Sequence, residues 1–287
     1  YTLQSIDIAA RKAKKTNIHV VLAEYLRVDL HVEQGLIKLV GHKWTHIKVS
    51  YLGIPEYIGR IWGCDHMFPT SLVYNIAYLL LPKSDWYMTL VSDFVLPNNF
   101  FKELDFEAND YPDAFYPYVD CLYLKPAETR HMIATFKRKG IFPQKYKGRR
   151  RYNDTTGAYG GAIILSHKKW KEVGGYTTEF FCGWSAEDLE MRNKLMQFNG
   201  GHLYRLNIRA LHMHHVKQKG YGKHNALGDY IATIHDWDIG HFNFTSLLEF
   251  YKIQRDKFTM DADALEKWSK VDKVYGESIL QEIKKVK

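Results

Sequence analysis

Apolar and polar positions alternate along the chain in two distinct rhythms. Runs rich in branched and aromatic residues, of the kind that form buried strands, span residues 17–25, 46–51, 86–90, 118–123, 160–165 and 202–209. Segments with apolar residues at helical spacing span residues 5–15, 32–39, 69–81, 100–106, 167–173 and 187–198. Strands that alternate with helices predict an α/β fold with a mostly parallel central sheet flanked by helices.

The pattern changes near residue 217. We expect one α/β domain over residues 1–217 and a C-terminal helical and aromatic extension, packed on that domain, over residues 218–287. The extension holds an aromatic run at 236–251, followed by helical patterns. Within the first domain, the polar and basic stretch 141–152 is typical of a mobile loop.

Composition adds that the protein is an ordinary globular one. The 287 residues are 46% hydrophobic and 25% charged, and the sequence has no apolar run long enough to span a membrane. Three cysteines are too few for a disulfide framework, so three buried thiols are favoured over one bridge with a spare thiol. No signal peptide precedes the first helix, and we expect an upstream strand or targeting segment to have been trimmed.

The net charge of +8 suits an anionic ligand, such as a nucleotide, a nucleic acid, an acidic glycan or a membrane surface. The basic runs lie apart, at 11–15, 145–151 and 284–287, which favours solvated faces, and no nucleic-acid-binding motif accompanies them. We therefore expect no nucleic-acid partner, while the basic segments could contact a membrane peripherally. The compartment stays open between the cytoplasm, a membrane periphery and, if an anchor was removed, the Golgi lumen.

Three chemically rich segments follow predicted strands or lie just beyond them. They are Ser92-Asp93, the stretch 183–188 and the stretch 212–215. In open α/β sheets the ligand crevice lies outside the carboxyl ends of the strands. This shared placement indicates one common site more strongly than any of the three segments alone.

Asp93 and the histidines that follow residue 211 offer ligands for a metal ion. A carboxylate at a strand exit could hold a divalent cation that neutralises a diphosphate, although Asp93 could equally shape a turn. His212, His214 and His215 offer imidazoles, which are common metal ligands. If the strand continued that far, His212 and His214 would face one side and His215 the other, so the three could not all bind one ion.

Glu187 and Asp188 open the helix predicted over 187–198 and allow two interpretations. Ser185 and Asp188 fit a capping box, which would make the acids structural. Asp188 could instead be a general base, and we expect the helix start to keep its carboxylate ionised. Before this segment, Gly160-Gly161 would let the backbone approach a ligand closely, or simply open a strand.

In their order and spacing these segments resemble the GT-A fold glycosyltransferases. The stretch 68–77 followed by 86–97 looks like the segment leading into the DXD metal motif, especially that of LARGE-type glucuronyltransferase domains. The stretch 160–184 is similar to the β-1,4-galactosyltransferase C-terminal region and to chondroitin-polymerase-like inverting transferases. His212-Met213-His214-His215 looks like the terminal metal-binding histidine segment of those enzymes.

The resemblance implies a Rossmann-like GT-A enzyme of polysaccharide or glycoconjugate biosynthesis. It would move a hexose or N-acetylhexosamine from a UDP-sugar to a hydroxyl of a carbohydrate acceptor, with inversion. Asp188 would be the catalytic base, and Asp93 with His212 or His215 would hold Mn²⁺ or Mg²⁺. The substrate-binding residues implied are Glu187, Trp184, Gly183, Gly161 and Ser92.

Three departures from the family pattern keep other functions open. Val91 replaces the first acid of the DXD motif, which bears on metal dependence, and Ser185-Ala186 replaces a glycine pair beside the base. The first nucleotide-binding strand is not evident before residue 5. A retaining GT-A transferase and a catalytically silent glycan- or nucleotide-binding domain of a larger assembly are the alternatives.

Overall fold

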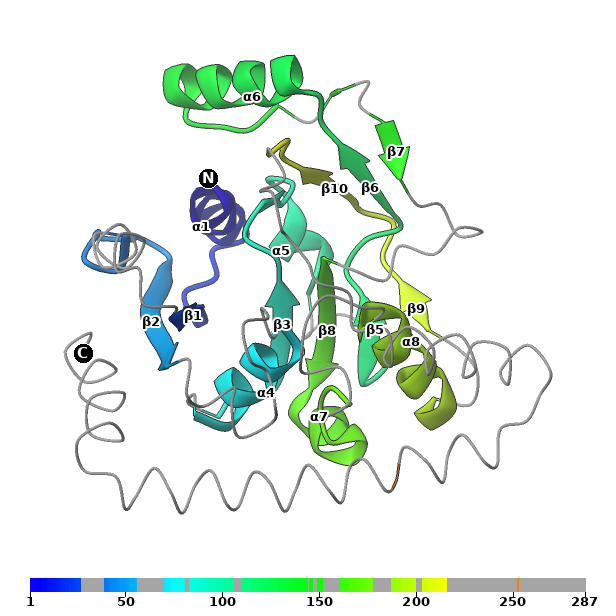
Figure 1. Ribbon diagram of the computed structural model, residues 1–287. Coiled ribbons are helices and arrows are strands. Elements are labelled where there is room, and N and C mark those ends of the chain that lie inside the picture. Colours follow the sequence, from blue (N-terminus) through cyan, green and yellow to red (C-terminus); the bar gives the residue numbers. More distant parts are fainter. Residues whose placement is uncertain are drawn as a thin grey trace.

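The computed structural model describes residues 1–26, 39–55, 70–80, 83–105, 110–143, 145–146, 149–151, 161–177, 187–199, 203–215 and 252. In this part of the chain, helices and strands alternate, and the predicted α/β class is confirmed (Figure 1). The described helices are α1 Thr2–Ala13, α4 Thr70–Leu80, α5 Phe100–Glu103, α6 Pro126–Lys139, α7 His167–Val173 and α8 Glu187–Phe198.

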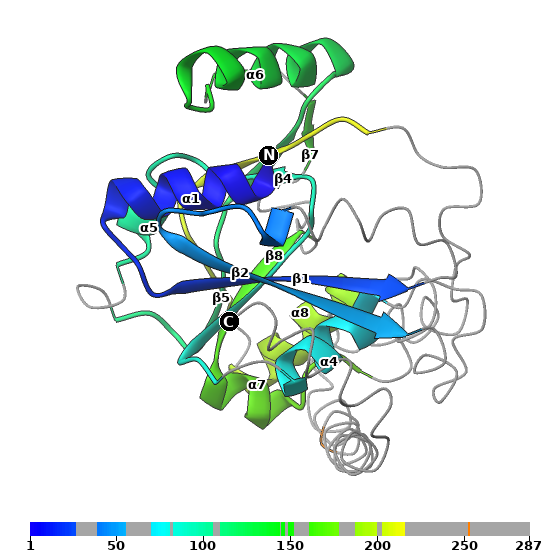
Figure 2. The same cartoon turned by 90° about the vertical axis from the view of Figure 1, so that its left-hand side faces the viewer.

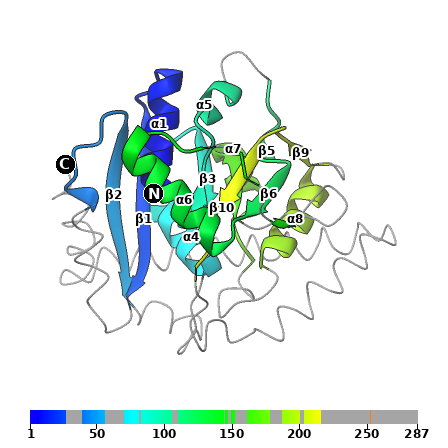
Figure 3. The ribbon, with the colours of Figure 1, turned by 90° about the horizontal axis from the view of Figure 1, so that it is seen from above.

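The strands form three described sheets. Their bounds are β1 Ile18–Leu26, β2 Ile47–Pro55, β3 Trp86–Leu90, β4 Phe94–Val95, β5 Ala114–Tyr116, β6 Asp120–Tyr123, β7 Arg149–Arg151, β8 Ala162–Ser166, β9 Tyr204–Arg205 and β10 Arg209–His212. The sheet orders are β1-β2, β3-β8-β5-β9 and β4-β10-β6-β7. Seen from above, the β1–β2 pair stands beside α1, next to the other strands (Figure 3).

Strand pairing is mixed rather than mostly parallel, which corrects the expectation for the sheet. Parallel pairs join β1 to β2, β6 to β10 and β5 to β9, each across a long intervening segment. The short edge strands β4 and β7 pair antiparallel with their neighbours, as does β8 with both β3 and β5. Only parallel neighbours require a long crossover connection, so short edge strands are free to pair antiparallel.

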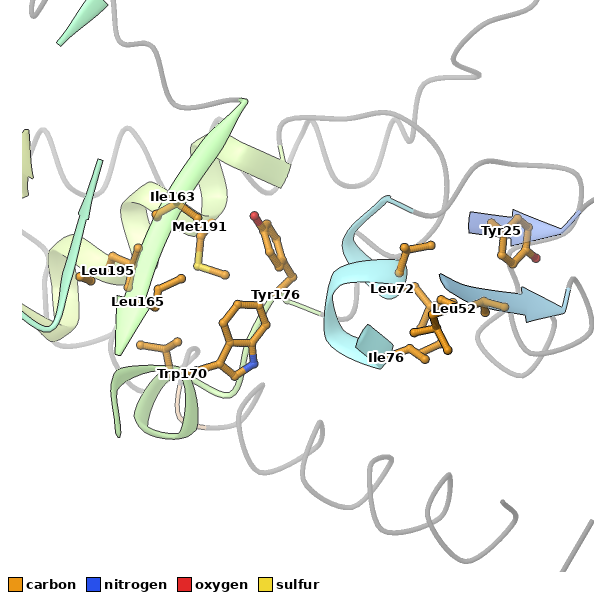
Figure 4. Packing of buried hydrophobic residues seen from close by; sticks show 14 of the residues in the cluster. Tyr25, Leu52, Leu72, Ile76, Ile163, Leu165, Trp170, Tyr176, Met191 and Leu195 are labelled. Atoms are coloured by element: carbon orange, nitrogen blue, oxygen red, sulfur yellow. The ribbon is translucent and has the colours of Figure 1, made fainter. Parts of the chain in front are cut away.

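The β3-β8-β5-β9 sheet buries both of its faces. Along β8, Ile163 and Leu165 point to one face and Ile164 to the other, as the two-residue period of a strand requires. The first face packs against α4, α7 and α8, with Trp170 and Leu195 among the buried residues (Figure 4). The second face packs against α1 and α5. The same alternation sends Tyr116 of β5 to the α8 side and Phe115 to the α1 side.

Helix α6 was not anticipated, although the sequence carries its boundary signals. Pro126 begins the helix, Glu128 accepts a hydrogen bond from the backbone N–H of Lys125 at 2.8 Å, and Gly140 ends it at φ 64°. Its apolar face is sparse, so helical periodicity gave little indication of it. In Figures 1 and 2 α6 lies beyond the β4-β10-β6-β7 sheet, and its Met132 is buried in the same cluster as residues of that sheet.

Other boundaries differ in smaller ways. The expected loop 141–152 contains β7, because Arg149–Arg151 pairs with the edge of β6. The single strand expected over 202–209 is two short strands, β9 and β10. Apart from Leu39 and Lys252, the helix expected at 32–39 and the C-terminal extension lie outside the described residues. Among the described helices, none is both long and apolar enough to cross a membrane.

Candidate metal and catalytic site

The turn after β3 and the end of β10 are held together by backbone hydrogen bonds. Strands β4 and β10 pair antiparallel with His212 opposite Phe94, and the N–H of Met213 donates to the carbonyl oxygen of Asp93 at 2.9 Å. On its other side β10 pairs in parallel with β6, with His212 opposite Tyr123. Main-chain geometry therefore brings Asp93 and His212 together, although 119 positions separate them in the sequence.

Asp93, His212 and His215 form a cluster that we call the metal triad. The Nε2 atoms of His212 and His215 lie 3.2 Å and 3.0 Å from the same carboxylate oxygen, Oδ2 of Asp93. The candidate ligand atoms of all three residues lie within 4.8 Å of one another. The Asp93 and His212 side chains are 25% and 12% exposed, whereas His215 is 45% exposed, so one edge of the triad faces solvent.

The hydrogen bonding around the triad leaves donor atoms that could hold a cation. The Nδ1 atom of His212 lies 2.9 Å from the carbonyl oxygen of Met213, so the Nδ1–H donates, and in the neutral imidazole Nε2 then carries the lone pair, which faces Asp93. The second carboxylate oxygen of Asp93, Oδ1, is buried and makes no hydrogen bond within the described residues. Acceptors that converge on one point need a proton or a metal ion between them, and two imidazoles with a carboxylate are a common divalent-metal donor set.

The expected alternation of the histidines does not limit the triad, because β10 ends at His212. Beyond the strand the backbone turns, and His215 reaches the same carboxylate as His212. His214 is exposed, and its backbone N–H donates to Oγ1 of Thr129 at 2.9 Å. The structure thus brings together the three residues that the sequence proposed as ligands and leaves His214 outside.

Two aromatic rings that sequence reasoning did not single out enclose the His212 imidazole. Tyr123 stacks on it with ring centroids 4.1 Å apart and planes 15° apart, and Phe94 meets it edge-on at 5.5 Å. Phe94 in turn lies over Gly161, where an added Cβ would be 2.2 Å from Cζ of Phe94. Gly161, at φ +99°, therefore permits the close approach of the Phe94 ring in this structure.

Ser92 and Val91 lie next to Asp93 in different environments. Ser92 is exposed, and its carbonyl oxygen accepts a hydrogen bond from Oγ1 of Thr2 at 2.5 Å. Val91 packs partly buried against an apolar cluster, and its N–H donates to the carbonyl oxygen of Gly161 at 2.9 Å. The position of the missing DXD acid is therefore an apolar contact in this chain.

Asp188 lies in the first turn of α8, and its side chain is half-buried. Burial raises its pKa from the usual 3.8, and this effect outweighs the opposing hydrogen bonds from backbone N–H groups, including that of Leu189 at 2.8 Å. The helix start favours the ionised form, as expected from the sequence, but the loss of hydration has the larger effect on the pKa. Ser185, the expected cap, lies outside the described residues.

The surroundings of Asp188 are aromatic. Burial, the largest cause, raises the pKa values of Tyr116, Tyr118 and Tyr176 well above 10, and the negative charge of Asp188 adds to the shift for each. Tyr118 also lies 5.9 Å from Phe94, ring centroid to ring centroid, and Phe94 borders the metal triad. Buried rings thus connect the surroundings of Asp188 with those of the triad.

The remaining predicted site residues are only partly placed. Glu187 is half-buried at the start of α8, next to Asp188. Trp184 and Gly183 lie outside the described residues. A separate cavity of about 420 Å³ contains none of the predicted site residues; it is lined by Glu103, Asp110, Tyr111, Pro112, Tyr204, Leu206, Asn207 and Ile208. Tyr111 and Tyr204 contact Phe115, on the face of the sheet opposite to Tyr116.

Residues 141–219 match the family model described as the N-terminal domain of galactosyltransferase. We call these matched residues, 141–219, the galactosyltransferase segment. This segment includes α7, α8 and β10, and therefore Asp188, His212 and His215, while Asp93 lies before it. The match confirms the resemblance to galactosyltransferases and the expectation of a glycosyltransferase enzyme.

Further comparisons extend beyond the galactosyltransferase segment. No curated protein matches the sequence. Among solved structures, the catalytic domain of Drosophila beta1,4-galactosyltransferase 7 in complex with xylobiose is 13% identical; the match covers 72% of this chain and 75% of that chain, with a TM-score of 0.38. A mutant of the same Drosophila enzyme, in complex with manganese, UDP-Gal and xylobiose, is 13% identical over 66% of this chain and 64% of that chain, with a TM-score of 0.36.

Proposed function

We propose that this glycosyltransferase is an inverting enzyme that moves a hexose or N-acetylhexosamine from a UDP-sugar to a hydroxyl of a carbohydrate acceptor. One observation carries the proposal: two imidazoles of the galactosyltransferase segment, those of His212 and His215, converge on one oxygen of Asp93. A divalent cation held there is suited to a diphosphate leaving group. UDP as the nucleotide follows from the resemblance to β-1,4-galactosyltransferases.

The donor set supports a bound cation even though Val91 stands in the place of the first DXD acid. Asp93, His212 and His215 would hold it, and the buried Oδ1 of Asp93 offers a second carboxylate oxygen. Manganese accepts mixed carboxylate and imidazole ligands, whereas magnesium prefers oxygen ligands, so Mn²⁺ is favoured over Mg²⁺. When bound, the ion supplies positive charge that stabilises the departing diphosphate.

Asp188 is the proposed catalytic base. Its carboxylate takes the proton of the acceptor hydroxyl, the acceptor oxygen forms a bond to the anomeric carbon, and the bond from that carbon to the diphosphate oxygen breaks. UDP leaves with the electron pair, and attack from the opposite face inverts the anomeric configuration. A general base works best when its pKa is closer to neutral than that of a solvated carboxylate, and burial moves Asp188 in that direction.

The other assignments are proposals of the same kind. Glu187, Trp184, Gly183, Gly161 and Ser92 are assigned to substrate binding. Residues 1–217 are assigned to the transferase domain and residues 218–287 to an extension packed on it. The basic stretch 145–151 is assigned to closing over the diphosphate, and the basic runs of the chain to peripheral membrane contact. Positive charge suits both roles.

A nucleotide-sugar screen tests the proposal directly. Each UDP-sugar is added with Mn²⁺, and the melting temperature of the protein is recorded, because a ligand of the native state stabilises it by mass action. We expect one UDP-sugar to raise the melting temperature and to be hydrolysed or transferred more slowly by Asp188→Asn. Asp110→Asn, which changes an exposed carboxylate elsewhere, is the matched control. The proposal fails if no UDP-sugar stabilises or reacts with the wild-type protein.

A further inference from the structure

The imidazole of His212, on β10, is held between aromatic rings from the two strands that flank β10. Its own strand, β10, lies between β4 and β6, and the N–H of Leu124, just after β6, donates to the His212 carbonyl oxygen at 2.9 Å. Tyr123 of β6 covers one side of the imidazole, and Phe94 of β4 meets it edge-on. The backbone hydrogen bonds fix the position of the His212 main chain, but the plane of its ring depends on these aromatic contacts.

The Tyr123 contact is the more constraining of the two. Its ring centroid lies 4.1 Å from that of His212, and the planes are 15° apart, so the two rings are in nearly parallel contact. Rotation of the imidazole about its Cβ–Cγ bond would drive its edge into the tyrosine ring. The hydrogen bond from Nδ1–H to the Met213 carbonyl also restrains the plane of the ring, at the edge that carries Nδ1. Together they direct Nε2 toward Asp93.

We propose that Tyr123 is a positioning residue for the metal triad, acting through His212. This inference rests on the proposed function only in requiring that the triad binds a divalent cation. The stack holds the imidazole in its ligating orientation before a cation arrives. An imidazole bound to a cation is also electron-poor, so its attraction to the electron-rich face of a tyrosine becomes stronger in the bound state. Both effects favour the metal-bound form.

The test measures Mn²⁺ affinity by the loss of the free-ion electron paramagnetic resonance signal, without donor or acceptor. Tyr123→Phe keeps the flat ring, Tyr123→Leu keeps apolar volume without it, and Tyr204→Ala removes an exposed tyrosine from another sheet. We expect Tyr123→Leu to weaken Mn²⁺ binding about tenfold, the lower end of what outer groups around metal ligands contribute. Tyr123→Phe and Tyr204→Ala should stay within about twofold of the wild type.

Folding is monitored in parallel by circular dichroism and thermal unfolding, which separates a positioning role from a merely structural one. If Tyr123→Leu is less stable yet binds Mn²⁺ as tightly as the wild type, the positioning role is wrong. If Tyr123→Phe loses as much affinity as Tyr123→Leu, the hydroxyl and not the stacked ring is responsible, and the inference is again overturned. A wild-type protein that binds no Mn²⁺ would instead refute the proposed metal site, and with it the premise of this inference.

Discussion

Oδ2 of Asp93 is shared by two imidazoles, with Nε2 of His215 at 3.0 Å and Nε2 of His212 at 3.2 Å. The sharing depends on the point at which β10 ends. If the extended strand continued through His215, the alternation of side chains would place His212 and His215 on opposite faces and separate them. The length of a four-residue strand therefore decides whether the three residues can bind one ion.

The histidine segment permits an internally controlled prediction. His212→Gln and His215→Gln each remove one imidazole ligand, and each should lower Mn²⁺ affinity by at least about tenfold, since losing a direct ligand costs no less than losing an outer-shell partner. His214→Gln alters an exposed neighbour of both and should leave affinity unchanged within about twofold. Isothermal titration with Mn²⁺ measures all three. Equal losses in all three variants would place the metal outside the triad.

Gly161 connects packing to the triad. In Gly161→Ala the new methyl group would meet the Phe94 ring, and overpacking of this kind costs about 1–3 kcal/mol, beyond the strain of a positive φ. Gly140→Ala introduces a positive-φ alanine where nothing lies within 4 Å, so it carries the backbone strain of about 1–2 kcal/mol without the clash. Urea unfolding should show Gly161→Ala to be the less stable of the two. Equal stabilities would mean that Phe94 gives way freely.

Asp188 should contribute unfavourably to stability at neutral pH. Burial raises its pKa in the folded protein, so the folded state holds its proton more tightly than the unfolded state does. The resulting loss of stability is absent below the unfolded pKa near 3.8 and grows as the pH rises toward the folded pKa. Asp188→Asn removes the charge, so it should be at least as stable as the wild type at pH 7, with a smaller advantage at pH 4.

The same variant separates catalysis from folding. Removing a general base lowers turnover by about 10²–10⁴-fold, and Asp188→Asn should show such a loss in sugar transfer while its melting temperature does not fall. Thermal unfolding at pH 4 and pH 7, together with a transfer assay, measures both effects. A variant that loses stability along with activity would indicate that Asp188 is a structural cap.

Local sequence patterns anticipated the elements that bury a regular face. Helices α4, α7 and α8 and strands β1, β3 and β8 appear where apolar spacing predicted them. Strand β4 has two residues, too few to show a period, and α6 buries little apolar surface. Strand β4 is part of the β4-β10-β6-β7 sheet next to the metal triad, and α6 packs on that sheet, so the surroundings of the site were harder to predict than the core.

The ligands were more readily predicted than the groups around them. Asp93, His212 and His215 offer metal-binding chemistry that is visible in the sequence itself. Tyr123 became relevant only through its register opposite His212 on β10, which no local pattern contains. The raised pKa of Asp188 likewise depends on burial beside tyrosines distant in sequence, which outweighs the helix-end effect that the local sequence suggested.

The anomeric configuration of the product tests the central claim most directly. Wild-type protein is incubated with Mn²⁺, the UDP-sugar selected by thermal shift and a carbohydrate acceptor, and the new glycosidic bond is examined by nuclear magnetic resonance before any anomerisation. Direct displacement assisted by Asp188 predicts a Mn²⁺-dependent product whose anomeric configuration is opposite to that of the donor. A product with the donor's configuration, or transfer that proceeds equally without the metal, would contradict the account.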